Sequence, residues 1–164
     1  MDNKKIAKLA MLLSISVVLG LIESFIPFFN GTIPGIKLGL ANIVVVFCIY
    51  ELSFKDALYI SILRVILIGI LRTGLFSISF FFSLFGALFS LIAMYFSKKY
   101  TNMSIVGVSV VGAIFHSVGQ IIIACLFLSN INIFYYLPIL LISSIVTGVI
   151  VGSISDRIIK YYNN

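Results

Sequence analysis

Charged side chains are scarce in this sequence, and their scarcity excludes a soluble globular domain. Only 10% of the 164 residues are charged, whereas 62% are hydrophobic and the mean hydropathy is +1.24. A soluble domain is roughly 25% charged and about 45–50% apolar. We therefore expect an all-α integral membrane protein in which residues 1–164 form a single membrane domain.

Metal ligands and disulfide partners are equally few. Cys48 and Cys125 fall in different expected spans and at different depths, so we expect packing residues rather than a disulfide. Two separate cysteines and a single histidine also lack the spacing of a metal site. We expect neither a metal nor another cofactor.

The chain also lacks a basic stripe, although its net charge is +6. Its lysines and arginines are spread over short loops and the ends of apolar runs, and no nucleic-acid-binding motif is present. This distribution is typical of membrane proteins, in which it sets the orientation. We expect the lipid bilayer, and no nucleic acid, as a partner.

Six apolar runs predict six membrane-spanning helices, since about 20 apolar residues cross a bilayer. The second run is short, and a re-entrant segment there would reduce the number of spans to five. The N-terminal run resembles a signal peptide but continues without an early small-residue cleavage site, so we expect a retained first span. The expected spans cover residues 6–29, about 36–50, about 57–71, 76–97, 103–128 and about 135–159.

The basic residues near the span ends predict the orientation. If the N-terminus is inside, eight lysines and arginines lie on the cytoplasmic side and only Lys37 and Arg72 lie outside. This excess predicts a multi-pass protein of the cell membrane with both termini in the cytoplasm. The inner residues are Lys4, Lys5, Lys8, Lys55, Lys98, Lys99, Arg157 and Lys160.

Polar side chains within the spans gather at one depth. With a rise of about 1.5 Å per residue, most of them lie in the outer third of a helix, whereas Arg64 lies near mid-depth. The inner halves carry few polar groups beyond Ser14, Ser16 and Thr147. We therefore expect an outward-open cavity above an apolar floor. Its candidate ligand-binding residues are Glu23, Lys37, Asn42, Arg64, Arg72, His116 and Gln120.

The charges of this group indicate a ligand with an anionic head. Three basic side chains oppose one carboxylate, a net charge of about +2, and arginine suits bidentate contact with carboxylate or phosphate. An apolar tail on the ligand would suit the apolar walls. Structural alternatives stay open: they are pairing of Glu23 with Arg64 or Arg72, snorkelling of Lys37 and Arg72, interhelical hydrogen bonding by His116 and Gln120, and backbone capping by Asn42.

The first span carries small residues in its cytoplasmic half. Ala10 and Ser14 form a small-xxx-small pair, and Ala7 lies one turn earlier. Small residues let helices approach closely. They serve either packing within the bundle or the docking of another membrane subunit.

Five stretches carry a resemblance to a known family. The chain resembles, along its whole length, the Gx transporter family, which is labelled heptaprenyl diphosphate synthase component I. That family is related to the substrate-binding S components of energy-coupling-factor (ECF) transporters. Ser117 stands where the family more often has asparagine. The stretches are residues 21–24 (LIES), 34–43 (PGIKLGLANI), 63–65 (LRV), 83–87 (SLFGA) and 112–120 (GAIFHSVGQ).

This resemblance implies a six-helix protein that captures a small molecule from outside the cell. It would reorient in a complex with a membrane coupling subunit and two ATPase subunits. In S components an AxxxA motif on the first helix contacts the coupling subunit, but here Met11 follows Ala7 at that spacing and Ala10 pairs with Ser14. The chain itself lacks a G-x-x-x-x-G-K-[ST] loop, so a partner would have to supply the ATPase.

Two other functions compete with transport. The family label suggests a part in prenyl diphosphate synthesis, but that reaction needs clustered carboxylates to hold Mg²⁺. We expect no enzyme, because the carboxylates are scattered, and keep an accessory role in isoprenoid metabolism as the alternative. A solitary channel or a structural subunit is the third possibility. The acidic residues are Asp2, Glu23, Glu51, Asp56 and Asp156.

Overall fold

The structure is a computed structural model that describes residues 3–25, 39–129 and 131–164, and every regular element in these ranges is helical. The all-α prediction is therefore confirmed for the described residues. A π-helical turn, η2 (Gly69–Thr73), extends the third helix, and a 3₁₀ turn, η3 (Ile131–Tyr136), precedes the last. The α-helices are α1 (Asn3–Phe25), α2 (Asn42–Glu51), α3 (Phe54–Ile68), α4 (Ile78–Tyr100), α5 (Ile105–Leu128) and α6 (Leu137–Asn163).

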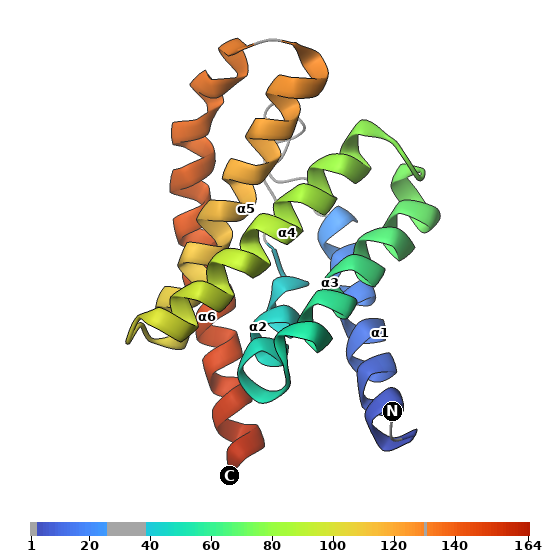
Figure 1. The fold of residues 1–164 in the computed structure, drawn as a ribbon, viewed down its shortest axis with the longest axis vertical. Helices are drawn as coiled ribbons and strands as arrows, with labels where there is room; N and C mark the ends of the chain where they lie inside the picture. The colour runs from blue at the N-terminus through green and yellow to red at the C-terminus, as the bar shows by residue number, and fades with distance from the viewer. Residues whose placement is uncertain (1–2, 26–38, 130) are drawn as a thin grey trace.

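Four of these helices, α1, α4, α5 and α6, are long and apolar enough to cross a membrane. The other two are shorter, with 10 residues in α2 and 15 in α3. These lengths are compatible with a multi-pass membrane protein. The number of crossings and the orientation stay predictions. In Figure 1, α1 begins and α6 ends at the same end of the bundle.

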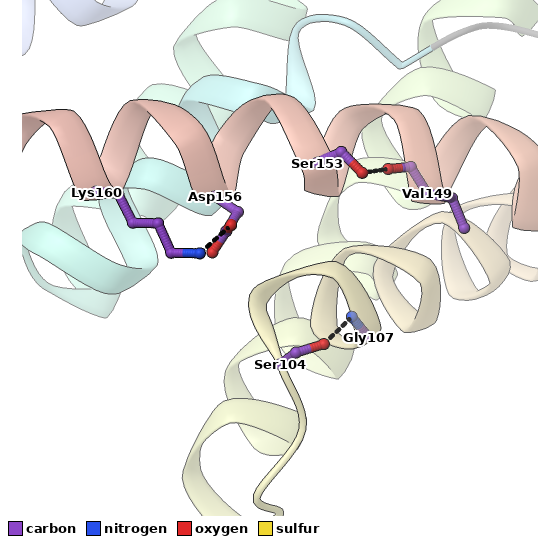
Figure 2. A network of polar contacts seen from close by, with 6 residues as sticks. All are labelled: Ser104, Gly107, Val149, Ser153, Asp156 and Lys160. Atoms are coloured by element: carbon purple, nitrogen blue, oxygen red, sulfur yellow. Dashed lines mark hydrogen bonds and ion pairs between the residues drawn. The ribbon is translucent and has the colours of Figure 1, made fainter.

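Serine side chains begin three of the helices. Ser53 accepts a hydrogen bond from the Asp56 N–H, Ser77 from the Phe80 N–H, and Ser104 from the Gly107 N–H. Such caps satisfy backbone donors that the first turn of a helix leaves unpaired. The cap of α5 is drawn in Figure 2, beside the exposed Lys160–Asp156 ion pair of α6 and the hydrogen bond from Ser153 to the Val149 carbonyl.

The short helix α2 forms the centre of the bundle. Its residues 43–49 are all buried, as expected of a helix that is apolar on every side. It packs against α1, α3, α4 and α6, and Figure 1 places it between α6 and α3. Cys48 is fully buried there, as expected of a packing residue, whereas Cys125 on α5 is half-buried.

Helices α5 and α6 approach each other unusually closely at two glycines. A Cβ added at Gly148 would lie 2.8 Å from the Val110 Cα, and one at Gly152 would lie 2.7 Å from the Val106 Cα. The two glycines form a G-x-x-x-G pattern, which brings membrane helices into backbone contact. Sequence reasoning missed this pattern, although both glycines stand at the right spacing in residues 148–152.

An ion pair between an exposed lysine and a buried carboxylate joins α1 to the first turn of α3. Lys5 Nζ lies 2.9 Å from Asp56 Oδ2, and the Ser53 hydroxyl donates to the same oxygen at 2.7 Å. Burial alone would raise the pKa of the Asp56 carboxyl, but the hydrogen bonds from Ser53 and Lys5 outweigh burial and lower this pKa below its ordinary value.

Two further lysines bind helices together at the same end. Lys8 Nζ donates to the Tyr162 hydroxyl at 2.8 Å, which joins α1 to α6. Lys98 Nζ donates to the Ile49 carbonyl at 2.7 Å, near the C-terminus of α2. A cation at this position offsets the partial negative charge of the helix end. The basic residues that predict orientation therefore also hold the bundle together.

The prediction that the inner halves of the spans carry almost no buried polar groups is wrong. Ser90, Ser109 and Ser155 are buried there, while Ser14 is exposed. Small hydroxyls are cheap to bury because they can bond to the carbonyl one turn back in their own helix. Ser155 does so with the Val151 carbonyl at 2.8 Å.

Candidate functional site

Helix α1 holds the turn that leads into α2. The Glu23 carboxylate accepts a hydrogen bond from the Gly39 N–H at 2.6 Å, and the Ser16 hydroxyl donates to the Ala41 carbonyl at 3.3 Å. Gly39 has a φ of 71°, a conformation that glycine adopts readily. The predicted site residue Glu23 therefore orders the backbone next to Asn42.

The buried cation Arg64 lies beside this turn. Its Nη1 donates to Asn42 Oδ1 at 3.2 Å, and only 6% of the residue is exposed. The Glu23 carboxylate also attracts the guanidinium electrostatically. Glu23, Asn42 and Arg64, which we call the arginine group, thus come from α1, α2 and α3.

Depth along the helices, taken from the sequence, sets Arg64 apart from the other polar residues, but the structure brings its side chain into contact with Asn42. The structure begins α2 at Asn42, so that residue is the first of a short helix. Its side chain is therefore within hydrogen-bonding distance of Arg64 in the middle of α3.

His116 and Gln120 lie together on α5 and face α4. A Cβ added at Gly86 would lie 3.0 Å from both Gln120 Cγ and His116 Cε1, so the missing side chain of Gly86 makes room for them. Gln120 is 4% exposed, and its Oε1 has no hydrogen-bond partner among the residues that the structure describes. We call His116 and Gln120 the glutamine group.

Ser117, where the chain departs from the pattern of the resembling family, has a structural partner. Its hydroxyl lies 2.6 Å from that of Ser144, and both residues are buried. The pair joins α5 to α6. Ser117 therefore faces away from α4, whereas the neighbouring His116 faces toward it.

The remaining predicted residues lie elsewhere or outside the described residues. Arg72 is exposed in the π-helical turn η2. Lys37 lies outside the described residues. Ala7, Ala10 and Ser14 are all exposed on α1, and the Ser14 hydroxyl donates to the Ala10 carbonyl at 2.9 Å. Convergence of the arginine and glutamine groups on one cavity stays a prediction.

Sequence reasoning missed the glycines that shape these groups. Gly86 accommodates the glutamine group, and Gly20 lets α1 approach α3, since a Cβ there would lie 2.5 Å from Ile68 Cδ1. Each of these residues is a lone glycine within a helical pattern. Because such a glycine weakens the helix, it often marks a place where another element packs closely, and this could have indicated both positions.

Residues 12–158 match the model of a protein family described as heptaprenyl diphosphate synthase component I. No curated protein and no solved structure matches the chain. The matched range contains all the predicted ligand-binding residues, whereas Ala7 and Ala10 lie before it. The match therefore spans the helices that carry both polar groups.

Proposed function

The chain belongs to the heptaprenyl diphosphate synthase component I family, and we propose that it is the substrate-binding subunit of an ECF-type transporter. In this role it captures a small, anionic and partly apolar molecule, such as an isoprenoid-related one, from the outer side of the cell membrane. A membrane coupling subunit and two ATPase subunits then drive uptake.

The burial of Arg64 is the observation that carries this proposal. A charged side chain within a membrane helix is costly, and such residues usually mark a binding site or a transport pathway. The hydrogen bond to Asn42 uses one of the five donors of the guanidinium. A carboxylate or phosphate of the ligand can accept from others in bidentate fashion.

The glutamine group supplies the second part of the proposed pocket. Gln120 Oε1 is a buried acceptor without a described partner, and buried polar atoms are normally hydrogen-bonded. A hydroxyl or another donor on the ligand would satisfy it. The ligand then carries an anionic group for Arg64 and a donor for Gln120.

The proposed transporter has six spans with both termini in the cytoplasm. The shared end of α1 and α6 supports this arrangement, as does the gathering of Lys5, Lys8 and Lys98 at that end. The coupling subunit docks on the exposed face of α1 that carries Ala7, Ala10 and Ser14.

We further propose that the chain is not itself a catalyst. Its described carboxylates are engaged in separate structural contacts rather than gathered around a metal-binding position. Glu23 accepts from Gly39, Glu51 from Asn163, and Asp156 from Lys160, while Asp56 pairs with Lys5. Chain elongation of a prenyl diphosphate would need carboxylates held together on Mg²⁺.

An accessory role in prenyl diphosphate metabolism is the second candidate function. The description of the family, a component of heptaprenyl diphosphate synthase, favours it. In this role the chain would bind a catalytic prenyl diphosphate synthase subunit at the membrane. Co-purification of such an enzyme, in place of a coupling subunit and ATPases, would select this function.

Replacement of Arg64 by methionine tests the transport proposal. The small molecule that co-purifies with the protein is identified by mass spectrometry, and its affinity is then measured for each variant. Arg64→Met should weaken binding at least tenfold while the protein still folds. The control Arg157→Met removes an exposed arginine of α6 and should leave affinity unchanged. Unchanged affinity in Arg64→Met, or the absence of any bound molecule, would reject the proposal.

A further inference from the structure

One side chain near the end of α6 joins three helices. The Tyr162 hydroxyl accepts a hydrogen bond from Lys8 Nζ of α1 at 2.8 Å. The Tyr162 ring meets the Phe47 ring of α2 edge to face, with the ring centroids 5.3 Å apart. The same ammonium group lies 4.7 Å from the Tyr162 ring centroid, within range of a cation–π attraction. Tyr162 therefore connects α1, α2 and α6 at the end of the bundle where α1 begins and α6 ends (Figure 1).

The next residue of α6 adds a contact to this junction. Asn163 Nδ2 donates to Oε1 of Glu51, the last residue of α2, at 3.0 Å. Both hydrogen bonds of the junction, from Lys8 to Tyr162 and from Asn163 to Glu51, are exposed to solvent. Water can replace either partner there, so these contacts open at lower cost than buried ones. We call Lys8, Phe47, Glu51, Tyr162 and Asn163 the tyrosine junction.

Helix α2 links the tyrosine junction to the arginine group. Its first residue, Asn42, accepts the hydrogen bond from Arg64. Toward its other end, Phe47 and the last residue, Glu51, contact α6. The 10 residues of α2, at about 1.5 Å each, give it a length of about 15 Å. Because a short regular helix moves largely as one body, a displacement at the junction reaches Asn42.

Lys8 lies beside the face of α1 that is proposed for docking. It directly follows Ala7, and Ala10 comes two residues later. Of the four long apolar helices in the described part of the chain, α1 is the least buried. Helix α6, in contrast, is in backbone contact with α5. A partner that docks on α1 would therefore displace Lys8 from Tyr162 more readily than it would separate α6 from α5.

We propose that the tyrosine junction controls ligand release, and that docking of the coupling subunit on α1 opens it. Docking draws Lys8 away from Tyr162, which frees the adjoining end of α2. The resulting shift of α2 withdraws Asn42, whose hydrogen bond orients the guanidinium of Arg64, and weakens the hold on the anionic group. This inference rests on the proposed transport function and adds a regulation to its site. Because such coupling is reciprocal, the bound ligand weakens docking by the same factor.

Hydrogen–deuterium exchange of the full chain in nanodiscs tests the path from the junction to α2. In Tyr162→Ala, exchange in residues 42–51 should be at least fivefold faster than in the parent. Tyr161→Ala is the matched control, because it is the same substitution one position earlier, at a residue that is 86% exposed. It should leave exchange in α2 unchanged. Unchanged exchange in Tyr162→Ala, or an equal acceleration in Tyr161→Ala, would overturn the proposal.

The dissociation rate of the co-purifying molecule provides the second readout. It should be at least fivefold higher in Tyr162→Ala than in the parent, and unchanged in Tyr161→Ala. Tyr162→Phe keeps the ring against Phe47 and lacks only the hydroxyl that Lys8 contacts, so it should fold like the parent and release the molecule at least twofold faster. Faster exchange in α2 without faster dissociation would refute the coupling to Arg64. If Tyr162→Ala does not fold, an unchanged rate in Tyr162→Phe has the same meaning.

Assembly with the coupling subunit and its ATPases separates this inference from the transport function. Docking should speed dissociation from the parent at least fivefold, but change it less than twofold in Tyr162→Ala, where the junction is already open. If docking acts equally on the parent and on Tyr162→Ala, the transport function stands and the tyrosine junction is refuted. The absence of any co-purifying molecule or coupling subunit would instead reject the transport function, and this inference with it.

Discussion

Gly86→Ala tests whether the glutamine group belongs to a ligand site. The added methyl carbon would lie 3.0 Å from both Gln120 Cγ and His116 Cε1. Favourable carbon–carbon contacts are about 3.5–4.0 Å, so each side chain must retreat by about 0.5–1 Å. Such a shift is large for a functional site, since misplacing reacting groups by about 1 Å can lower a rate by about a hundredfold.

The effect of Gly86→Ala on stability should be smaller than its effect on binding. Alanine favours the helix over glycine by about 0.8–1 kcal/mol, while overpacking costs about 1–3 kcal/mol. The free energy of unfolding should therefore fall by about 0–2 kcal/mol. Affinity for the co-purifying molecule should fall at least tenfold, because in the proposed pocket the displaced groups contact it directly.

Calorimetric titration and thermal unfolding of the purified variant measure the two effects separately. Gly107→Ala is the control: it is the same substitution in a helix, on α5, and the three atoms nearest its Cβ belong to Met103 and Ser104, at 3.4 Å or more. It should be as stable as the parent or more stable, with unchanged affinity. If Gly86→Ala folds and binds as tightly as the parent, the glutamine group is structural and not part of the site.

Three further predictions concern packing, pH and assembly. Gly152→Ala places a Cβ 2.7 Å from the Val106 Cα, a backbone atom that cannot rotate away. Thermal unfolding should therefore show a net loss of stability of about 1–2 kcal/mol. An unchanged Tm would contradict the close α5–α6 contact. Because the pKa of Asp56 is lowered, its stabilising contribution is complete above the ordinary pKa of 3.8 and is lost as the pH falls through the lowered value. The Tm should therefore fall below about pH 4, and Asp56→Asn should flatten this dependence; an equally steep fall in that variant would place the titrating group elsewhere. Ala10→Leu should reduce co-purification of a coupling subunit and its ATPases at least fivefold without lowering the Tm, and undiminished assembly would exclude the α1 face.

The helix breaks were predictable because they depend on local chemistry. Residues 101–104 and 51–56 combine polar side chains with capping serines, and the helices end and begin there, within a few residues of the predicted limits. The start of α2 was not predictable to that accuracy. Residues 36–41 are as apolar as the helix that follows, so hydropathy alone does not place its first residue at Asn42.

The site was predictable only in its residue types. A mid-span arginine indicates a partner or a cavity from its energetic cost alone, and Arg64 has a partner in Asn42. The identity of that partner depends on how α2 and α3 pack, which sequence spacing does not specify. The same holds for Gly86, because its role depends on the facing side chains of α5.

The contact between Lys98 and the end of α2 has a consequence for experiments that map topology. Such experiments often remove positive charges and ask whether the protein inverts in the bilayer. Removing Lys98 would also deprive the Ile49 carbonyl of its donor beside the buried core, so a misfolded product would be mistaken for an inverted one. Lys55, which is exposed on α3, is the safer position for a charge-removal scan.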